Sequence, residues 1–568
     1  MSASESPVAA PTTRWQRWAA VAFVVLAMLR IVATYKDLSE TVDEVAHIGG
    51  GMEWLALGTY TFEPQHPPLA RVAAATGPYL LGIRNQGQQN LWQEGRRVLF
   101  ADGQYRRNLI AARLGILLFF PLAAFFVWRI GVDGFGPSMA LASVACFTLL
   151  PTVLAHYGVA TTDGPFVALF AAAVYAMQRW LRGPTVLRGV GLGVAGALSL
   201  VTKYSAIPYL GLLAMLAGAA RAWSAWRHRA GRASLGANVD VDRASGDTWS
   251  WPGAIVSLAV GGVAGVFVAW AMLRFSVGTL RGIPFPAPEI LRGIRGVAEH
   301  NQYGHPAYFL GKVRSLGVWY FFPVMLVLKT PLSALLLGLA GFAVLVRRAI
   351  RSSDWLPLMP LLTAVAILAF SVTARINIGI RHILPVYIAL ALAAGFAWDW
   401  AWRRWSGRAT RAMLATGIAA LSLGSFTVHP DYLAYFNVLA GKDPTRIVAD
   451  SDLDWGQDLF RLSKVLREER VDTLTFAYIG TRGIDQIVGA PVNYWDGTGR
   501  PTGWVAVSET KYRQGITTFS RGRYYSQSDA FFWLDSAATF TRVGKGVRLY
   551  RVLPSAAAPR DTTSATSR

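Results

Sequence analysis

The feature that most constrains the fold of this chain is a series of apolar runs, each long enough to cross the roughly 30 Å of hydrocarbon in a bilayer. The runs lie near residues 15–34, 109–130, 137–156, 163–180, 187–222, 252–273, 316–346, 355–373, 383–402 and 411–428. We divide 187–222 into two spans, because Lys203 and Pro208 interrupt it at "VTKYSAIP". Hydrophobic residues make up 53% of the 568 residues and charged residues only 15%. The pattern predicts a polytopic α-helical membrane protein with about eleven transmembrane helices.

The remaining composition excludes several other classes of protein. The first apolar run lacks a small-residue cleavage pattern, so we interpret it as a retained helix and not as a removed signal peptide. The single cysteine, Cys146, lies in an apolar run, which argues against a disulfide framework and a thiolate metal site. The formal net charge of +22 is concentrated in short loops beside the apolar runs. Charges in such loops set membrane orientation and favour anionic lipids, so they do not indicate nucleic-acid binding.

The basic loops predict how the chain is oriented. If the helices alternate, one side of the membrane receives "TTRWQRW", "QRWLRGPTVLR", "RAWSAWRHRAGR", "RRAIRSSDW" and "WRRWSGRATR". The positive-inside rule makes that side the cytoplasm. The opposite side then receives the polar residues 36–108, the loop 274–315, "HYGVATTDGP", "VTKYSAIP" and "TARINIGIRH". We therefore predict a multi-pass protein of the cytoplasmic (inner) membrane, with a cytoplasmic N-terminus and a periplasmic or extracellular C-terminal part.

Composition also predicts the domains. Residues 1–14 form a disordered cytoplasmic tail, 15–428 the transmembrane domain with an outer loop at 36–108, 429–553 an extracytoplasmic domain, and 554–568 a disordered tail. Within 429–553, "TLTFAYIG", "GWVAVSE" and "GVRLYRVL" predict strands, and "DWGQDLFRLSKVLREE" predicts an amphipathic helix. This region is therefore expected to be a small α/β domain. The cytoplasmic segment 231–250 is expected to be a flexible loop.

The outer loop contains two adjacent carboxylates, Asp43 and Glu44. Adjacent carboxylates repel, and desolvation near a membrane surface raises a carboxyl pKa, which suits at least one of them to general-base catalysis. The same letters, "TVDE", also fit a capping box between Thr41 and Glu44, and this alternative stays open. His47 and His66 follow, and a carboxylate–histidine metal site is a second open alternative to ordinary loop hydrogen bonding, although their spacing matches no recognised ligand array.

Cations recur on the predicted outer face: Arg71, Lys203, Lys329, Arg375, Arg381 and His382. Charges in or near a bilayer are costly and are usually paired or functional. Together they predict a site for an anionic headgroup, because arginine in particular grips phosphate oxygens. The alternative for any single side chain is that it extends from a helix end towards water.

Two further motifs have weaker meanings. "GLGVAG" (Gly191, Gly193, Gly196) matches the dinucleotide-binding pattern, but no strand precedes it, so close helix packing explains it better. "ADSDLDWGQD" begins like a calcium loop and then lacks the required glycine and glutamate, since Trp455 and Arg461 stand there. We interpret it as a turn whose acidic residues cap the following helix, with a bound ion or ligand as the alternative.

Seven segments, taken in order, resemble a known family. They are "DEVAHIGGGMEWLALGTYTFEPQHPPLAR", "ATTDGPFVALF", "LVTKYSAIP", "GHPAYFLGK", "YFFPVMLVLKTPL", "NIGIRHILPVY" and "DSDLDWGQDL". Together they look like bacterial phospholipid-carrier-dependent glycosyltransferases of family 39, which includes protein O-mannosyltransferases and aminoarabinose transferases within superfamily C. The resemblance covers roughly residues 17–553 and implies the superfamily C glycosyltransferase fold.

The resemblance implies an enzyme that moves a sugar, with inversion, from a polyprenyl-phosphate donor to an acceptor outside the cytoplasmic membrane. The family's catalytic acidic residue lies in the first outer loop, and the matching positions here are Asp43 and Glu44. Of these two catalytic candidates, Asp43 would act as the base that deprotonates the acceptor, while Glu44 would orient the acceptor or the surroundings of Asp43. The residues expected to bind the donor phosphate are Lys203, Arg381, His382 and Arg71. The residues expected to support the site are Asp163, His47 and His66. No cofactor is implied with certainty, and a divalent metal stays open.

The acceptor is not implied. The C-terminal region does not resemble the sugar-binding module of eukaryotic O-mannosyltransferases, so a lipid, a glycan and a protein acceptor all remain. Two other classes of function compete with the transferase. A lipid-linked sugar flippase or transporter usually shows inverted repeats around a midplane site, whereas here polar residues gather in outer loops. A membrane-anchored sensor would not require so many spans.

Overall fold

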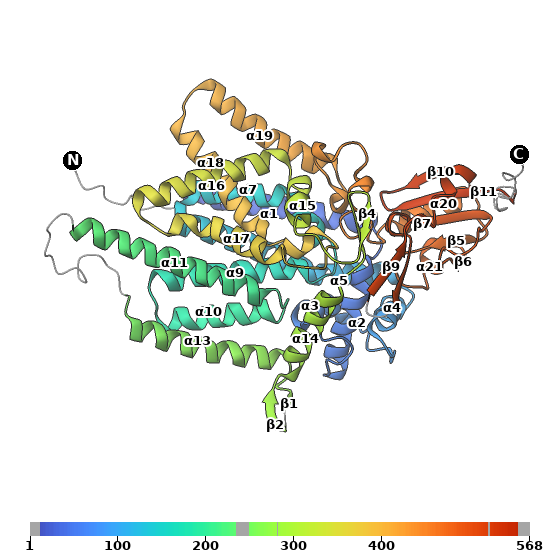
Figure 1. Ribbon diagram of the computed structural model, residues 1–568, viewed down its shortest axis with the longest axis horizontal. Helices are drawn as coiled ribbons and strands as arrows, with labels where there is room; N and C mark the ends of the chain where they lie inside the picture. Colours follow the sequence, from blue (N-terminus) through green and yellow to red (C-terminus); the bar gives the residue numbers. More distant parts are fainter. Residues whose placement is uncertain (1–11, 234–248, 281, 521–522, 555–568) are drawn as a thin grey trace, which may run out of the picture.

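The computed structural model describes residues 12–233, 249–280, 282–520 and 523–554. Most of the two predicted disordered tails and of the predicted flexible loop 231–250 lies outside the described residues. The molecule is elongated, with a helical body at one end and a β-sheet near the C-terminus at the other (Figure 1).

The helical body consists of apolar helices that run side by side (Figure 1). They are α1 (Arg14–Ala33), α6 (Phe119–Phe135), α7 (Pro137–Leu149), α8 (Pro151–Tyr157), α9 (Asp163–Arg182), α10 (Val186–Leu200), α11 (Ala206–Ala233), α13 (Trp251–Met272), α15 (Phe321–Lys329), α16 (Leu332–Ser352), α17 (Met359–Ser371), α18 (Val386–Arg404) and α19 (Arg408–Thr427). Short 3₁₀ helices connect them or follow them: η1 (Thr34–Lys36), η2 (Leu356–Leu358), η3 (Ile380–Ile383), η4 (Tyr432–Ala434), η5 (Val438–Ala440) and η6 (Pro444–Arg446).

Several helices of the body have the length and apolarity that a membrane span needs. Among the described residues these are Arg14–Lys36, Tyr105–Phe135, Ala206–Ala230, Trp251–Met272 and Leu332–Ser352, five in all, or six if α7 and α8, bent by 67°, form one span. The predicted helical membrane fold is therefore confirmed. The predicted number of about eleven spans is not confirmed, because the other predicted runs form helices that are either too short or, like α9, α18 and α19, long enough but not apolar enough to meet the same criteria.

One predicted span is divided in two. Residues 316–346 form α15 and α16 with a break at Thr330 and Pro331, because proline cannot continue the hydrogen-bond ladder of the preceding helix. The Asn437 side chain donates hydrogen bonds to the carbonyl oxygens of Val327 (2.6 Å) and Thr330 (2.8 Å). A residue from a distant segment thus satisfies carbonyls that the break leaves free. The predicted break at "VTKYSAIP" is present between α10 and α11.

Four helices of the N-terminal third lie at the junction between the helical body and the sheet (Figure 1). They are α2 (Val42–Leu57), α3 (Pro68–Leu80), α4 (Leu91–Phe100) and α5 (Tyr105–Leu117). Glycines set their close approach: a β-carbon added at Gly51 would lie 1.9 Å from the carbonyl oxygen of Arg71, and one at Gly95 would lie 1.8 Å from that of Val45. The predicted helix-packing role of "GLGVAG" is confirmed for Gly193, whose added β-carbon would lie 1.8 Å from the carbonyl oxygen of Gly261.

The C-terminal region forms a five-stranded mixed sheet in the order β10-β11-β7-β5-β6. Its strands are β5 (Leu474–Ala477), β6 (Val492–Tyr494), β7 (Gly503–Ser508), β10 (Ala538–Val543) and β11 (Val547–Val552). The three strand predictions correspond to β5, β7 and β11. The sheet is accompanied by α20 (Leu459–Glu468), α21 (Asp485–Val488), α22 (Glu509–Gln514) and α23 (Leu534–Ala537). The remaining elements are α14 (Pro288–Tyr303) and the strand pairs β1 (Val277–Leu280) with β2 (Ile283–Pro286), β3 (Ala307–Phe309) with β4 (Lys312–Arg314), and β8 (Ile516–Ser520) with β9 (Arg523–Gln527).

The sheet and the outer helices share one hydrophobic core. Buried side chains of α2 and α4, including Val45, Met52 and Val98, belong to the same cluster as Leu462 of α20 and Phe476 of β5. Burial of such side chains is the main favourable contribution to packing two elements together. The C-terminal α/β region is therefore packed against the helices of residues 36–108. The domain boundaries predicted from composition stay a prediction.

Candidate active site

Four of the predicted site residues form one ionic network, although they come from distant segments. Arg381 of η3 donates from Nη1 to Oδ2 of Asp43, at 2.6 Å, and the same nitrogen lies 3.8 Å from Oδ2 of Asp163. Lys203, in the break between α10 and α11, donates from Nζ to Oδ1 of Asp163 at 2.5 Å. The structure thus assembles two cations and two carboxylates from four distant segments of the chain.

The two carboxylates of this network differ in accessibility. The Asp43 side chain is 22% exposed, whereas that of Asp163 is 0% exposed and lies against both cations. A buried charge is tolerated when it is paired in this way. Asp163 is therefore placed to hold Lys203 and Arg381 at a fixed separation. Asp43 sits where its carboxylate reaches the edge of the network.

Glu44 lies beside Asp43 in sequence but in a different environment. Its carboxylate accepts hydrogen bonds from Arg113 Nε (2.8 Å) and Nη2 (2.9 Å), and from the backbone N–H groups of Ala160 (2.7 Å) and Thr41 (2.7 Å). The Thr41 contact is the one that the capping-box alternative predicted. The Glu44 side chain is completely buried. Because four donors occupy it, Glu44 is suited to orienting the N-terminus of α2, and hence Asp43, and not to contacting an acceptor.

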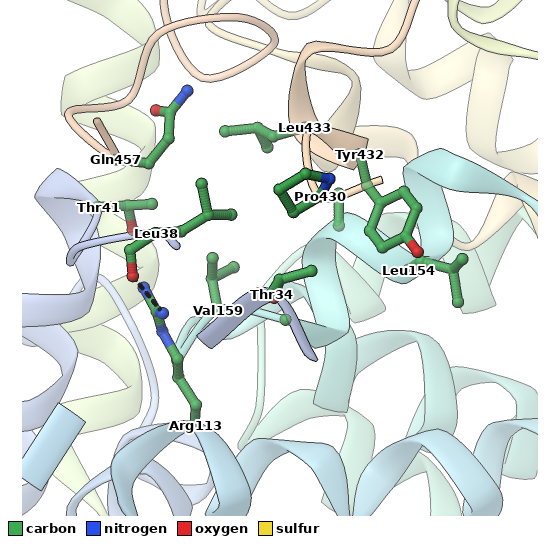
Figure 2. Close-up of a pocket in the computed structure, with 12 residues that line it drawn as sticks. Thr34, Leu38, Thr41, Arg113, Leu154, Val159, Pro430, Tyr432, Leu433 and Gln457 are labelled. Carbon is green, nitrogen blue, oxygen red and sulfur yellow. Dashed lines mark hydrogen bonds between the residues drawn. The ribbon is translucent and has the colours of Figure 1, made fainter. Parts of the chain in front are cut away.

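A small cavity lies next to this helix start. Its volume is about 20 Å³, and Thr41, Arg113 and Gln457 are among the residues that line it. Figure 2 shows Arg113 extending towards the backbone of Leu38, with which it forms a hydrogen bond of 2.9 Å. Such a volume holds about one water molecule. The cavity is therefore too small for a sugar or a lipid headgroup.

Arg71 is engaged within its own loop. It is buried and donates to the ring Nδ1 of His47 (3.2 Å), to the Tyr60 hydroxyl (3.1 Å), to the Glu63 backbone carbonyl (2.8 Å) and to the Glu63 carboxylate. Burial disfavours ionised Glu63, yet the hydrogen bond from His66 and the charge of Arg71 lower its pKa to about 2. The structure therefore favours a positioning role for Arg71 over the predicted direct contact with a phosphate.

Three buried nitrogens beside the network have no hydrogen-bond partner among the described residues. They are Nε of Arg381, Nε2 of His382 and Nε2 of His47. Burial, followed by the nearby cations, lowers the pKa of both histidines well below its ordinary value, so both rings are neutral. A neutral imidazole nitrogen and a guanidinium N–H are groups that a polar ligand can satisfy.

Trp455 is a site residue that the sequence motifs did not identify. Its ring lies over the Arg381 guanidinium, with 4.4 Å from Cζ to the ring centroid, and its backbone carbonyl accepts the N–H of Val42 at 2.9 Å. The Asp452 carboxylate accepts the N–H of Ile380 at 3.1 Å from each oxygen. One loop therefore holds both Arg381 and the residue that precedes Asp43.

This acidic loop, residues 450–458, does not cap the following helix as predicted. Helix α20 begins at Leu459, and its N-cap residue Asp458 makes no side-chain cap hydrogen bond. The carboxylates bind other segments instead: Asp454 accepts the N–H of Thr510 (2.9 Å), and Asp458 accepts that of Gly546 (2.8 Å). The available signal was four aspartates within nine residues, which is more than one helix cap can use.

The alternative metal sites are not assembled. Among the residues that the structure describes, no group of three His, Cys, Asp or Glu side chains is arranged to hold a metal ion. The rings of His47 and His66 are 5.2 Å apart and edge-on, and Nδ1 of His66 lies 3.0 Å from the Glu63 carboxylate. Of the alternating aspartates, Asp450 accepts the N–H of its neighbour Ser451, whereas the carboxylates of Asp452 and Asp454 accept N–H groups from other segments.

Two predicted cations lie outside the network. Lys329 is buried and donates to the carbonyl oxygens of Leu433 (2.6 Å) and Asp452 (2.7 Å), so it supports the acidic loop. Arg375 is exposed, and within the described part of the chain its guanidinium donates to the backbone oxygen of Gln302 alone, at 3.4 Å. For Arg375 the alternative of a side chain extended into solvent fits better than a place in the site.

The central helices of the body match a known family. Residues 105–235 match the family model "Dolichyl-phosphate-mannose-protein mannosyltransferase". This segment resembles that family. The predicted resemblance is therefore confirmed over a stretch that contains Asp163 and Lys203. It does not contain Asp43 or Arg381, and no match is found among the curated proteins.

Solved structures of glycosyltransferases are also similar to the chain. ArnT from Cupriavidus metallidurans in the apo state is 14% identical, with 96% of this chain and 100% of that chain covered and a TM-score of 0.48. The same protein bound to undecaprenyl phosphate is 14% identical, with 95% of this chain and 99% of that chain covered and a TM-score of 0.46. The oligosaccharyltransferase AglB from Archaeoglobus fulgidus, in complex with an inhibitory peptide and a dolichol-phosphate, is 10% identical. The match covers 91% of this chain and 75% of that chain, with a TM-score of 0.43. At these identities and scores, no residue role is transferred from them.

Proposed function

We propose that the chain is a membrane glycosyltransferase that moves a hexose or pentose from a polyprenyl-phosphate donor to an acceptor, with inversion at the anomeric carbon. The observation that carries this proposal is the convergence of Lys203 and Arg381 beside Asp43 and Asp163. The family match at residues 105–235 and the seven sequence motifs support the same class of enzyme.

The chemistry follows from the charges. Asp43 accepts the proton of the acceptor nucleophile, whose lone pair forms a bond to the anomeric carbon. The bond from that carbon to the phosphate oxygen breaks on the opposite side, and its electron pair remains on the lipid phosphate. Negative charge develops on this leaving group, so fixed cations lower the barrier. Lys203 and Arg381 supply those cations.

The ion pair between Arg381 and Asp43 means that donor binding also affects the catalytic carboxylate. A phosphate that binds Arg381 competes with Asp43 for the same guanidinium, because both are anions that accept its N–H groups. Donor binding then releases the Asp43 carboxylate towards the acceptor. Nε of Arg381 and Nε2 of His382, which have no partner among the described residues, supply further donors for phosphate or sugar oxygens. The groups that contact the substrates are held in position by further residues, which are Arg71, Glu44, His47 and His66.

The reaction is proposed to occur outside the cytoplasm. The basic segments of the chain lie at or near helix ends on the side of the body opposite to the sheet (Figure 1), and the positive-inside rule assigns that side to the cytoplasm. The network would then face the periplasm or the cell exterior. The acceptor would be a lipid, a glycan or a protein of the envelope.

The test is an assay of purified full-length protein in detergent. Radiolabelled polyprenyl-phosphate hexoses and pentoses are incubated with envelope lipid, glycan and protein fractions, and the release of free polyprenyl phosphate is measured. The expected result is acceptor-dependent release with one donor class. A flippase would leave the glycosidic bond intact in every mixture, and an intact donor after reconstitution with all acceptor fractions would contradict the proposal.

A further inference from the structure

A second cationic cavity lies outside the ionic network. Its volume is about 380 Å³, which is in the range of small-ligand sites. It opens between the segment that follows α19 and the turn that joins β10 to β11. Three cations line it, Lys442, Arg542 and Lys545, together with the carboxylate Asp443 and the apolar Leu453. None of the predicted site residues belongs to this lining.

Two of the three cations that line the cavity form no ion pair with the described residues. Among the described residues, neither the Lys442 nor the Lys545 ammonium has an ion-pair partner, whereas Nη2 of Arg542 lies 3.5 Å from Glu509. The one lining carboxylate, Asp443, is already occupied, since it accepts the Thr445 hydroxyl at 2.6 Å. Two ammonium groups are therefore free to bind an anion of modest size.

Exposed apolar side chains lie close in sequence to Lys442. In η5, four residues or fewer before Lys442, Val438 is 80% exposed and Leu439 is 58% exposed. This turn follows α19, whose Met413 and Leu423 are also exposed. Exposed apolar groups next to lysines are typical of a protein surface at the membrane interface, where the apolar groups enter the acyl region and the cations reach the headgroups. A soluble anion would need the cations but not the apolar turn.

We propose that this cavity binds the phosphate of an anionic membrane lipid. Lys442 and Lys545 contact the phosphate oxygens, while Val438 and Leu439 insert beside the acyl chains. The proposal does not rest on the transfer reaction, because none of these side chains belongs to the network of Asp43 and Arg381. It rests on the cations that line the cavity and on the exposed apolar residues of η5 that precede Lys442.

The experiment measures lipid binding by the full-length protein in a zwitterionic detergent, by native mass spectrometry. The probes are phosphatidylglycerol, phosphatidylcholine and inorganic phosphate. The double variant K442Q/K545Q is compared with K312Q/K464Q, which removes the same charge from two exposed lysines outside the cavity. Thermal unfolding in the same detergent checks that both variants are folded.

The expected result is that K442Q/K545Q binds phosphatidylglycerol about thirtyfold more weakly than the wild type, since each of the two interfacial lysines contributes about 1 kcal/mol to anionic lipid binding and about 1.4 kcal/mol corresponds to a factor of ten. The control variant keeps the wild-type affinity, and phosphatidylcholine binds weakly to all forms. Equal affinity in the two variants would overturn the site. Displacement of phosphatidylglycerol by an equal concentration of inorganic phosphate would overturn the lipid as its ligand and leave a site for free phosphate.

Discussion

The adjacent side chains Asp43 and Glu44 of α2 lie in different environments. Asp43 is partly exposed and paired with a cation from η3, whereas Glu44 is buried among four hydrogen-bond donors. One residue is therefore available for chemistry and the next fixes the helix that carries it. The two carboxylates are adjacent in sequence, so only their surroundings distinguish them.

We predict that Glu44→Gln destabilises the protein, whereas Asp43→Asn does not. Removing the charge of Glu44 leaves Arg113 buried and unpaired, which costs about 3–5 kcal/mol. Thermal unfolding in detergent, followed by size exclusion, measures the difference. Equal melting temperatures for Glu44→Gln and the wild type would show that Arg113 finds another partner.

We predict that the ring of Trp455 affects turnover through Arg381. Trp455→Leu removes the aromatic face below the guanidinium, which corresponds to about 1–2 kcal/mol or roughly tenfold in rate. Trp455→Phe keeps a face and should retain most of the activity, and both variants keep the backbone bond to Val42. The ratio of kcat to KM for the donor is compared in the two proteins. Identical losses would assign Trp455 to packing alone.

At the level of elements, the acidic loop joins parts that are far apart in the chain. Its carboxylates and carbonyls hold η3, α15, α22 and the turn between β10 and β11. Asp454 is buried near Asp458 and Glu509, and burial raises its pKa to about 7. The Asp454 carboxyl therefore titrates near neutral pH, well above an ordinary aspartate.

The raised pKa of Asp454 predicts a pH-dependent stability. The folded state binds this proton more tightly than the unfolded state, so the stabilising contribution is present near pH 4 and is lost as the pH rises towards 7. The slope is at most about 1.4 kcal/mol per pH unit. Thermal unfolding of the wild type and of Asp454→Asn from pH 4.5 to 7.5 tests this, and the variant should show the flatter profile. Parallel profiles would contradict the assignment.

The crossing of α2 and α3 predicts a strong effect of one methyl group. Gly51→Ala places a β-carbon 1.9 Å from the Arg71 carbonyl oxygen, so the helices must separate, at a cost of about 1–3 kcal/mol. Gly196→Ala on α10 is the matched control, because nothing lies within 4 Å of the added carbon. The two melting temperatures should move in opposite directions or differ by several degrees. A stable Gly51→Ala protein would show that the crossing is looser.

For the whole molecule, sequence patterns predicted whatever depends on local composition. Apolar runs gave most helices of the body, and alternation gave β5, β7 and β11, because both signals lie within a few consecutive residues. The meeting of Asp43, Lys203 and Arg381 was expected only through topology and the family resemblance.

What the sequence could not predict depends on contacts between distant segments. Trp455 reaches Arg381 because the acidic loop is hydrogen-bonded to η3, and the break in 316–346 is stabilised by Asn437, about a hundred residues later. The burial of Arg71 among His47, Tyr60 and Glu63 likewise needs the loop in three dimensions. Spacing along one chain contains none of this information.

The most direct measurement is the transfer rate of Asp43→Asn with the donor that the wild type uses, at equal donor occupancy in the purified protein. General-base catalysis contributes about 10²–10⁴-fold, so the account predicts that sugar transfer falls by at least 10²-fold while donor binding and the melting temperature are retained. In the same assay, Lys203→Met should lower both sugar transfer and donor binding. Transfer by Asp43→Asn at the wild-type rate would contradict the central claim that this network is the active site.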